Sequence, residues 1–139
     1  MSDFVLDASV ALAWVLDNPI PPYAMDVRRA LGNGKRGLVP ALWHLEIANG
    51  LISAERRQDL VGADLMDALA TIQATAAQVL DTDMTLIALA EALTNARSFQ
   101  WTAYDSVYLN LAQRDRLPLA TLDKRLRTAA TRAGIPAMS

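Results

Sequence analysis

The chain has no cysteine and a single histidine, His44, among its 139 residues. Without cysteine it forms no disulfide and offers no thiolate to a metal, and a reducing, cytoplasmic compartment is compatible with this composition. Long apolar runs are also missing, since every apolar stretch is too short or too interrupted to cross a bilayer. The first residues, Met1-Ser2-Asp3, lack the positively charged segment of a secretory signal peptide.

The composition predicts one globular domain over residues 1–139. Apolar residues make up 53% and charged residues 20% of a chain that is long enough to bury a core. The net charge of −2 is unevenly spread, because residues 97–139 carry seven bases and three acids, or +4, which leaves −6 for residues 1–96. A basic C-terminal third beside an acidic site could seat a polyanion, and the same arginines also fit an ordinary solvated helix face.

Short apolar segments alternate with helical patterns along the chain. Strands are predicted at residues 3–7, 37–40, 78–80 and 117–122. Helices are predicted at residues 8–16, 23–31, 41–56, 59–77, 84–97, 103–114 and 124–133, with Asp59 and Asp83 as N-caps. This alternation predicts an α/β fold with a central, mostly parallel sheet and helices on both faces. Ligands of such sheets bind at the carboxyl ends of strands, where Asp7 and Asp123 are expected to lie.

Four carboxylates end or interrupt apolar runs, where a charge is costly unless it is paired or bound to a cation. They are Asp7, Glu46, Asp105 and Asp123. No basic residue lies near Asp7 or Glu46 in the sequence. We therefore expect the four acids to meet in one pocket and to hold a divalent metal.

Each acid taken alone also has an ordinary structural explanation. Asp7 and Asp123 are well placed to cap the helices that follow them, and Asp105 suits the first turn of a helix. Glu46 fits an exposed polar stripe that continues with Asn49 one turn later. Capping and metal binding are compatible, so these explanations do not remove the metal hypothesis.

Carboxylates without histidine or cysteine suit Mg²⁺ or Mn²⁺ rather than zinc. Such an ion lowers the pKa of a bound water, orients it and neutralises charge that develops on a phosphoryl group. Phosphodiester hydrolysis is therefore the reaction class that the four acids favour.

Four segments carry a resemblance to a known family. They are Val5–Ser9, Val39–Asn49, Thr102–Leu109 and Leu119–Asp123. Their order and spacing resemble the PIN domain and, within it, the VapC-type ribonuclease toxins of bacterial toxin–antitoxin pairs. The resemblance covers nearly the whole chain, and the acidic quartet of the family maps onto Asp7, Glu46, Asp105 and Asp123.

The resemblance implies an endoribonuclease that depends on Mg²⁺ or Mn²⁺ and that uses a bound water to hydrolyse RNA. It also implies a homodimer and a VapB-type antitoxin that wraps the toxin and places a C-terminal segment near the acidic pocket. These partners are implied by the family alone and do not follow from composition or spacing.

Several further residues are candidates for supporting roles. Ser9 and Thr121 lie two residues from an acid, and Asn49 lies one helical turn after Glu46, so each is predicted to support the acids. The simpler alternatives are a first-turn serine, a strand threonine and a helix-packing asparagine. Three more residues are RNA-contact candidates: Trp101 by stacking, and Lys124 and Arg125 by charge.

Two other functions remain open at this point. An aspartyl-nucleophile phosphatase would use an acid at the end of the first strand, as Asp7 is, but its usual pattern places a second Asp where Ser9 stands. A catalytically silent PIN-like binding module would act only through partners. His44 is two residues from Glu46 and therefore points elsewhere on a helix, which favours a structural or surface role.

Overall fold

A computed structural model describes residues 1–87 and 89–139 of the chain. Its elements in chain order are β1 (Phe4–Leu6), α1 (Ala8–Leu16), α2 (Pro22–Gly32), β2 (Gly37–Pro40), α3 (Ala41–Arg56), α4 (Ala63–Val79), β3 (Leu80–Asp83), α5 (Leu89–Phe99), α6 (Ala103–Asp115), β4 (Leu119–Ala120) and α7 (Lys124–Arg132). The strands form a four-stranded sheet in the order β3-β2-β1-β4, and each neighbouring pair is parallel. The predicted α/β fold is confirmed.

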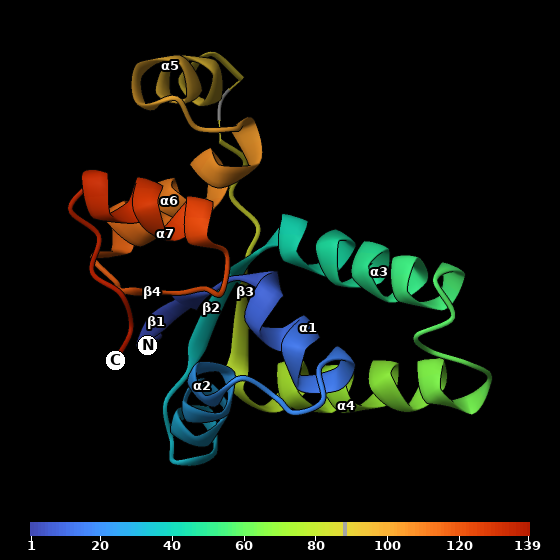
Figure 1. Ribbon diagram of the computed structural model, residues 1–139. Helices are drawn as coiled ribbons and strands as arrows, with labels where there is room; N and C mark the ends of the chain where they lie inside the picture. Colours follow the sequence, from blue (N-terminus) through green and yellow to red (C-terminus); the bar gives the residue numbers. More distant parts are fainter. Residues whose placement is uncertain (88) are drawn as a thin grey trace.

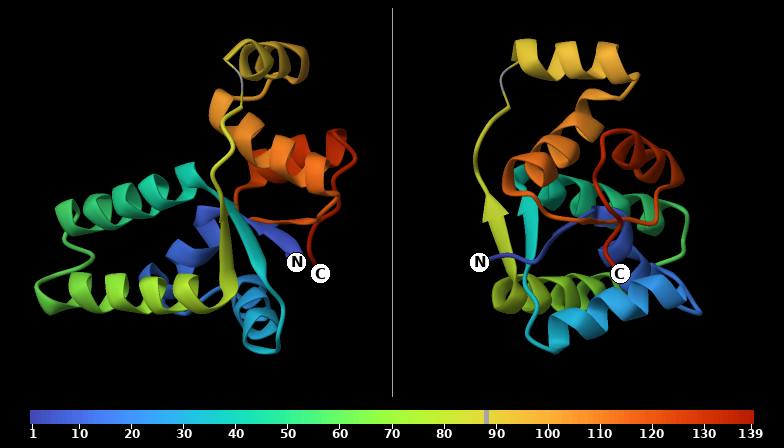
Figure 2. Two further views of the ribbon diagram at one scale, coloured as in Figure 1. Left: turned by 180° about the vertical axis from the view of Figure 1, so that it is seen from behind. Right: turned by 90° about the vertical axis from the view of Figure 1, so that its left-hand side faces the viewer.

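Helices cover both faces of this sheet. α6 and α7 lie on one face, while α1, α2 and α4 lie on the other (Figure 1). α3 and α4 run side by side and extend beyond the sheet, and α5 lies beyond α6, away from the strands (Figure 2). No helix within the described residues is both long and apolar enough to cross a membrane.

The inner strand β1 determines where a site forms. Its residues Phe4, Val5 and Leu6 are all buried, as expected of a strand that pairs on both edges and is covered on both faces. The chain leaves β1 toward β2 on one side, and β4 returns later to pair on the other side. The strand order therefore reverses at β1, and the carboxyl ends of β1 and β4 meet at the kind of position where α/β folds bind ligands.

Close helix packing brings α1 against α3 beside this position. A Cβ atom at Gly50 of α3 would lie only 2.6 Å from Cδ1 of Leu12 in α1. Glycine is thus the residue that lets these two helices approach each other. Its role is packing. α1 begins directly after Asp7, and α3 begins five residues before Glu46.

Three predicted boundaries were wrong in the middle of the chain. The helix expected from Asp59 begins at Ala63, and Asp59 instead pairs with Arg57 at 3.0 Å. That helix continues to Val79, so the strand expected at residues 78–80 lies at Leu80–Asp83. A short apolar run after a helical pattern does not reveal where the helix ends.

Asp83 is the last residue of β3 and does not cap the helix expected at residues 84–97. The helix there, α5, begins at Leu89, and residue 88 of the expected range lies outside the described residues. The last strand is also shorter than expected, because β4 covers only Leu119 and Ala120 of the expected residues 117–122. The other predicted elements agree with the structure to within two residues at each end.

Candidate active site

Asp7 follows β1 directly and is buried, with 6% of its surface exposed. It occupies the N-cap position of α1, but its side chain makes no capping hydrogen bond. Its Oδ2 instead accepts hydrogen bonds from Ser9 Oγ at 2.6 Å and from Thr121 Oγ1 at 2.8 Å. Both hydroxyl groups bind the same oxygen, so Oδ1 is left without a hydroxyl donor.

Ser9 and Thr121 also connect Asp7 to the end of β4. Ser9 Oγ accepts a hydrogen bond from the N–H of Leu122 at 3.0 Å, and Thr121 Oγ1 accepts one from the N–H of Asp123 at 3.0 Å. Each hydroxyl therefore donates to a carboxylate and accepts from the backbone. The structure places both predicted supporting hydroxyls against Asp7, and they hold the ends of β1 and β4 together.

Glu46 extends from the first half of α3 and is held by a residue that the sequence did not single out. Tyr108 of α6 is 2% exposed, and its hydroxyl donates to Glu46 Oε1 over 2.6 Å. Tyr108 lies three residues after Asp105, and residues at this spacing share a helix face. This spacing from Asp105 is the one feature of the sequence that could have pointed to a role for Tyr108 in the site. An aromatic residue of the core shows the same spacing.

Burial and mutual repulsion raise the pKa values of two of the acids. Burial is the main cause that raises the pKa of Asp7 above its ordinary 3.8, against the two hydroxyl donors that lower it, and the charge of Asp123 raises it further. Burial also raises the pKa of Glu46, which the Tyr108 hydrogen bond opposes. The charges of Asp7, Asp105 and Asp123 all add to the rise at Glu46, so the four acids border one electrostatically coupled region.

Asp105 and Asp123 each perform the capping role that was their simpler explanation. Asp105 forms a capping box with Thr102 at the start of α6, with N–H to oxygen distances of 3.0 and 3.3 Å. Asp123 caps α7 by accepting from the N–H groups of Arg125 and Leu126 at 2.9 and 3.2 Å. Asp105 Oδ2 also lies 3.7 Å from Nη2 of Arg125. Capping fixes both acids in position, and their charges lie near enough to Glu46 to raise its pKa.

Comparison with known proteins assigns the fold to a family. Residues 4–131 match the PIN domain family, which is most of the chain. This chain belongs to the PIN domain family. A crystal structure of PAE2754 from Pyrobaculum aerophilum is similar, with a TM-score of 0.71 and 19% identity over 92% of this chain and 84% of that one. At this identity the likeness supports the fold alone, and no curated protein matched the sequence.

PIN domains typically bind a divalent metal, and the family indicates nuclease activity. The donor chemistry at this site fits such an ion, because Asp7 and Glu46 present carboxylate oxygens, the sequence has no cysteine, and its one histidine contacts Thr82. Within the described residues, however, no three acidic, histidine or cysteine side chains lie close enough to form a metal cage by themselves. Mg²⁺ needs only one or two protein carboxylates and keeps several waters, so this PIN domain does not require a three-acid cage.

The remaining candidates are distributed around the site of this PIN domain. Asn49 is exposed and makes no side-chain hydrogen bond to another described residue, so the structure gives no contact through which it supports Glu46. Lys124 and Arg125 are exposed at the start of α7. Trp101 is only 7% exposed, and its ring stacks on Phe99 with centroids 4.5 Å apart. The burial of Trp101 leaves little ring surface for an RNA base, which is a correction to the stacking expectation.

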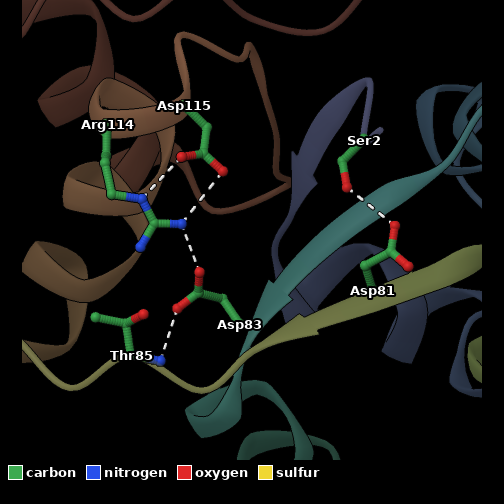
Figure 3. A network of polar contacts seen from close by, with 6 residues as sticks. All are labelled: Ser2, Asp81, Asp83, Thr85, Arg114 and Asp115. Carbon is green, nitrogen blue, oxygen red and sulfur yellow. Dashed lines mark hydrogen bonds and ion pairs between the residues drawn. The ribbon is translucent and has the colours of Figure 1, made fainter.

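Two further acids, Asp81 and Asp83, pair with arginines and are not part of the acidic quartet. Asp81 pairs with Arg36 at 2.8 Å. Asp81 also accepts a hydrogen bond from Ser2, and Asp83 pairs with Arg114 of α6 (Figure 3). Arg36 and Arg114 lower the pKa values of Asp81 and Asp83 respectively. These acids hold β3 against its neighbours. His44 is exposed and contacts the hydroxyl of Thr82 at 2.9 Å, in agreement with a structural role.

Proposed function

We propose that this PIN domain is a metal-dependent endoribonuclease and the toxin of a VapBC-type toxin–antitoxin pair. The observation that carries the proposal is the placement of Asp7 at the carboxyl end of β1, where hydroxyls of Ser9 and Thr121 hold one of its oxygens, with its charge acting on Glu46. Burial, and then neighbouring like charges, raise the pKa values of the buried Asp7 and the half-buried Glu46 above those of ordinary carboxyls. A divalent cation relieves that repulsion, and the site is therefore suited to bind one.

Mg²⁺ or Mn²⁺, once bound, supplies a water of lowered pKa and a positive charge for the scissile phosphate. Asp7 offers Oδ1 as the ligand oxygen, while Ser9 and Thr121 hold Oδ2 and prevent the carboxylate from rotating. Tyr108 holds one oxygen of Glu46, and the other oxygen would be available to the metal. Asp105 and Asp123, held by their helix caps, would accept hydrogen bonds from waters on the metal.

The alternative phosphatase mechanism is not favoured by the contacts of Asp7. A carboxylate nucleophile must have an oxygen free to attack and a nearby acid to protonate the leaving group. The side chain two residues after Asp7 is Ser9, whose hydroxyl donates to Asp7 and is itself held by Leu122. That position therefore supplies a positioning contact and no second carboxyl group.

The proposed partners are an RNA substrate, a second copy of the chain and a VapB-type antitoxin. Large apolar side chains exposed on α3 and α5 support a protein interface, among them Leu45 (70% exposed), Leu89 (86%) and Leu93 (58%). Light scattering of the purified chain tests the homodimer. The antitoxin would be supported by a small reading frame beside this gene that encodes a DNA-binding segment and a disordered tail.

Cleavage of single-stranded RNA by the purified chain tests the activity. We expect cleavage with Mg²⁺ or Mn²⁺ and none in EDTA. The variants Asp7→Asn and Glu46→Gln should each lower the rate by at least about 100-fold, since each removes a carboxylate from the proposed metal site. Asp67→Asn, which changes an exposed acid on α4, is the matched control. Cleavage that survives EDTA, or that is unchanged in both site variants, would contradict the proposal.

A further inference from the structure

A cavity of about 280 Å³ lies directly beside Asp105. One wall is the end of α5 and the loop that follows it, with Phe99, Gln100 and Trp101, and the opposite wall is a face of α7. Its volume is just below the roughly 300–1,000 Å³ of typical small-ligand pockets, so it suits a ligand no larger than one nucleotide. The cavity shares Asp105 with the proposed active site, so a ligand bound there would lie beside that site.

The α7 wall of this cavity is basic. Arg125, Thr128 and Arg132 follow one another at spacings of three and four residues, so they lie on one helix face. The side chain of Arg125 is 65% exposed and only loosely paired with Asp105, at 3.7 Å. Arg132 is exposed and forms no ion pair with any residue that the structure describes. Two arginines with little or no internal compensation favour an anionic ligand, and phosphate is the group that arginine binds in a bidentate manner.

The opposite wall is aromatic and ends in a polar side chain. Phe99 is 44% exposed and is supported from behind by the buried ring of Trp101, at a centroid distance of 4.5 Å and an angle of 20°. A supported but exposed aromatic ring is a platform on which a nucleobase stacks. Gln100 has a φ of 57° and is exposed at the rim, where its amide offers both a donor and an acceptor. The indole nitrogen of Trp101 has no hydrogen-bond partner among the described residues.

We propose that this cavity binds one nucleotide of the RNA substrate next to the scissile phosphodiester. Its phosphate contacts Arg125 and Arg132, its base stacks on Phe99, and Gln100 contacts the base edge. This inference rests on the proposed ribonuclease function. It also gives Arg125 a second partner: Arg125 lies 3.7 Å from Asp105 in the free protein and would turn to the phosphate when RNA binds.

Binding of adenosine 5′-monophosphate in EDTA tests the cavity without any cleavage. The three tryptophan indole N–H groups give separate NMR resonances, and we expect that of Trp101 to shift as the nucleotide is added. The resonance of Trp14 should not move, because its indole N–H donates to the Ala24 carbonyl at 2.8 Å, outside the cavity. Inorganic phosphate is the second probe, and it should bind more weakly than the nucleotide because it cannot stack.

Two variants report on the two walls. Arg132→Gln should raise the Kd of the nucleotide about tenfold through loss of a charge-assisted contact. Phe99→Leu should weaken the nucleotide about tenfold and leave phosphate binding unchanged. The matched control is Arg56→Gln, an exposed arginine in the last turn of α3, which lies far from α7 (Figure 1). Equal effects of Arg132→Gln and Arg56→Gln, or equal affinity for nucleotide and phosphate, overturn the proposal.

Cleavage kinetics of the same proteins separate this inference from the proposed function. If the wild-type chain cleaves RNA, Arg132→Gln should raise KM about tenfold with kcat nearly unchanged, as expected for a group that binds substrate and transition state equally. If the chain cleaves RNA but the Trp101 resonance does not respond to nucleotide, the nucleotide site is rejected and the ribonuclease activity is supported. If the chain does not cleave RNA but binds nucleotide in an Arg132-dependent manner, the ribonuclease activity is rejected and the nucleotide site is supported.

Discussion

Tyr108 donates a hydrogen bond to Glu46 over 2.6 Å and joins α6 to α3 at the centre of the acidic site. The contact links two residues that are 62 positions apart in the chain. Each partner needs this hydrogen bond. Tyr108 is buried, and the pKa of Glu46 is raised by burial and by its acidic neighbours. Tyr108 is therefore a positioning residue for Glu46 as well as part of the core.

The Tyr108→Phe variant tests this positioning role. It keeps the ring in the core and removes the hydroxyl, which should lower Mn²⁺ affinity about tenfold because an outer-shell partner no longer orients the carboxylate. The folded state should lose only about 1 kcal/mol, the typical contribution of one hydrogen bond. Isothermal titration with Mn²⁺ measures the first effect and urea denaturation the second.

A tyrosine on the same helix provides the control. Tyr104 of α6 is 65% exposed, and Tyr104→Phe should change neither Mn²⁺ affinity nor stability. The positioning role is rejected if Tyr108→Phe binds Mn²⁺ as the wild type does, whatever its stability.

The stability of the metal-free chain should rise as the pH falls from neutrality toward the ordinary carboxyl pKa values. Asp7 and Glu46 have folded-state pKa values above their ordinary 3.8 and 4.5, so the folded chain binds protons more tightly than the unfolded chain in this range. Urea denaturation in EDTA at several pH values measures the slope. Asp7→Asn removes one of these groups and should reduce the slope and raise the stability near pH 7.

At still lower pH the stability should fall as the pH falls. Asp81 and Asp83 have pKa values that are lowered by their arginine partners, so the stability they contribute is present above their ordinary 3.8 and is lost as the pH falls through their folded-state pKa values. The unfolding free energy should therefore pass through a maximum on the acidic side of neutrality. A stability that falls steadily from neutral pH downward contradicts the raised pKa values of Asp7 and Glu46.

The parts of the fold that the sequence predicted are those with a local signal. The apolar run of β1 ends in a charged residue, and this alone places Asp7 at the end of a buried strand. Asp123 lies directly before a helix, which predicts its capping role. The common site for all four acids stays a prediction: the other three charges raise the pKa of Glu46, but within the described residues no three acids are grouped closely enough to hold a metal by themselves.

The parts that were missed depend on residues far apart in the chain. Nothing near Tyr108 indicates that its hydroxyl meets Glu46, and an aromatic residue in an apolar helix looks like an ordinary core residue. Asp83 looks like a helix cap because its partner Arg114 is 31 residues away. In the sequence, Trp101 resembles an aromatic residue exposed in a loop. Its burial depends on packing against Phe99 and on the position of α7.

The salt dependence of RNA binding tests the contribution of Lys124. Its ammonium group is exposed at the start of α7, next to Arg125 and close to the acidic site. If Lys124 contacts an RNA phosphate, Lys124→Ala should weaken binding and reduce the slope of log K against log salt by about 0.7, the value for one single-stranded contact. Binding of a single-stranded oligonucleotide in EDTA at several salt concentrations measures this slope. An unchanged slope removes Lys124 from the binding surface.

Asp123 combines a structural and a proposed catalytic role that two substitutions separate. Its Oδ1 accepts hydrogen bonds from the N–H groups of Arg125 and Leu126, so Asp123→Ala should destabilise the chain by about 1 kcal/mol through loss of the N-cap. Asp123→Asn keeps the capping oxygen, because asparagine is as good an N-cap as aspartate, and its stability should equal that of the wild type. The negative charge that faces Glu46 is nevertheless lost, and RNA cleavage should fall about tenfold or more. Thermal denaturation together with cleavage rates of both variants decides the case: full activity in Asp123→Asn means that this acid serves the fold alone.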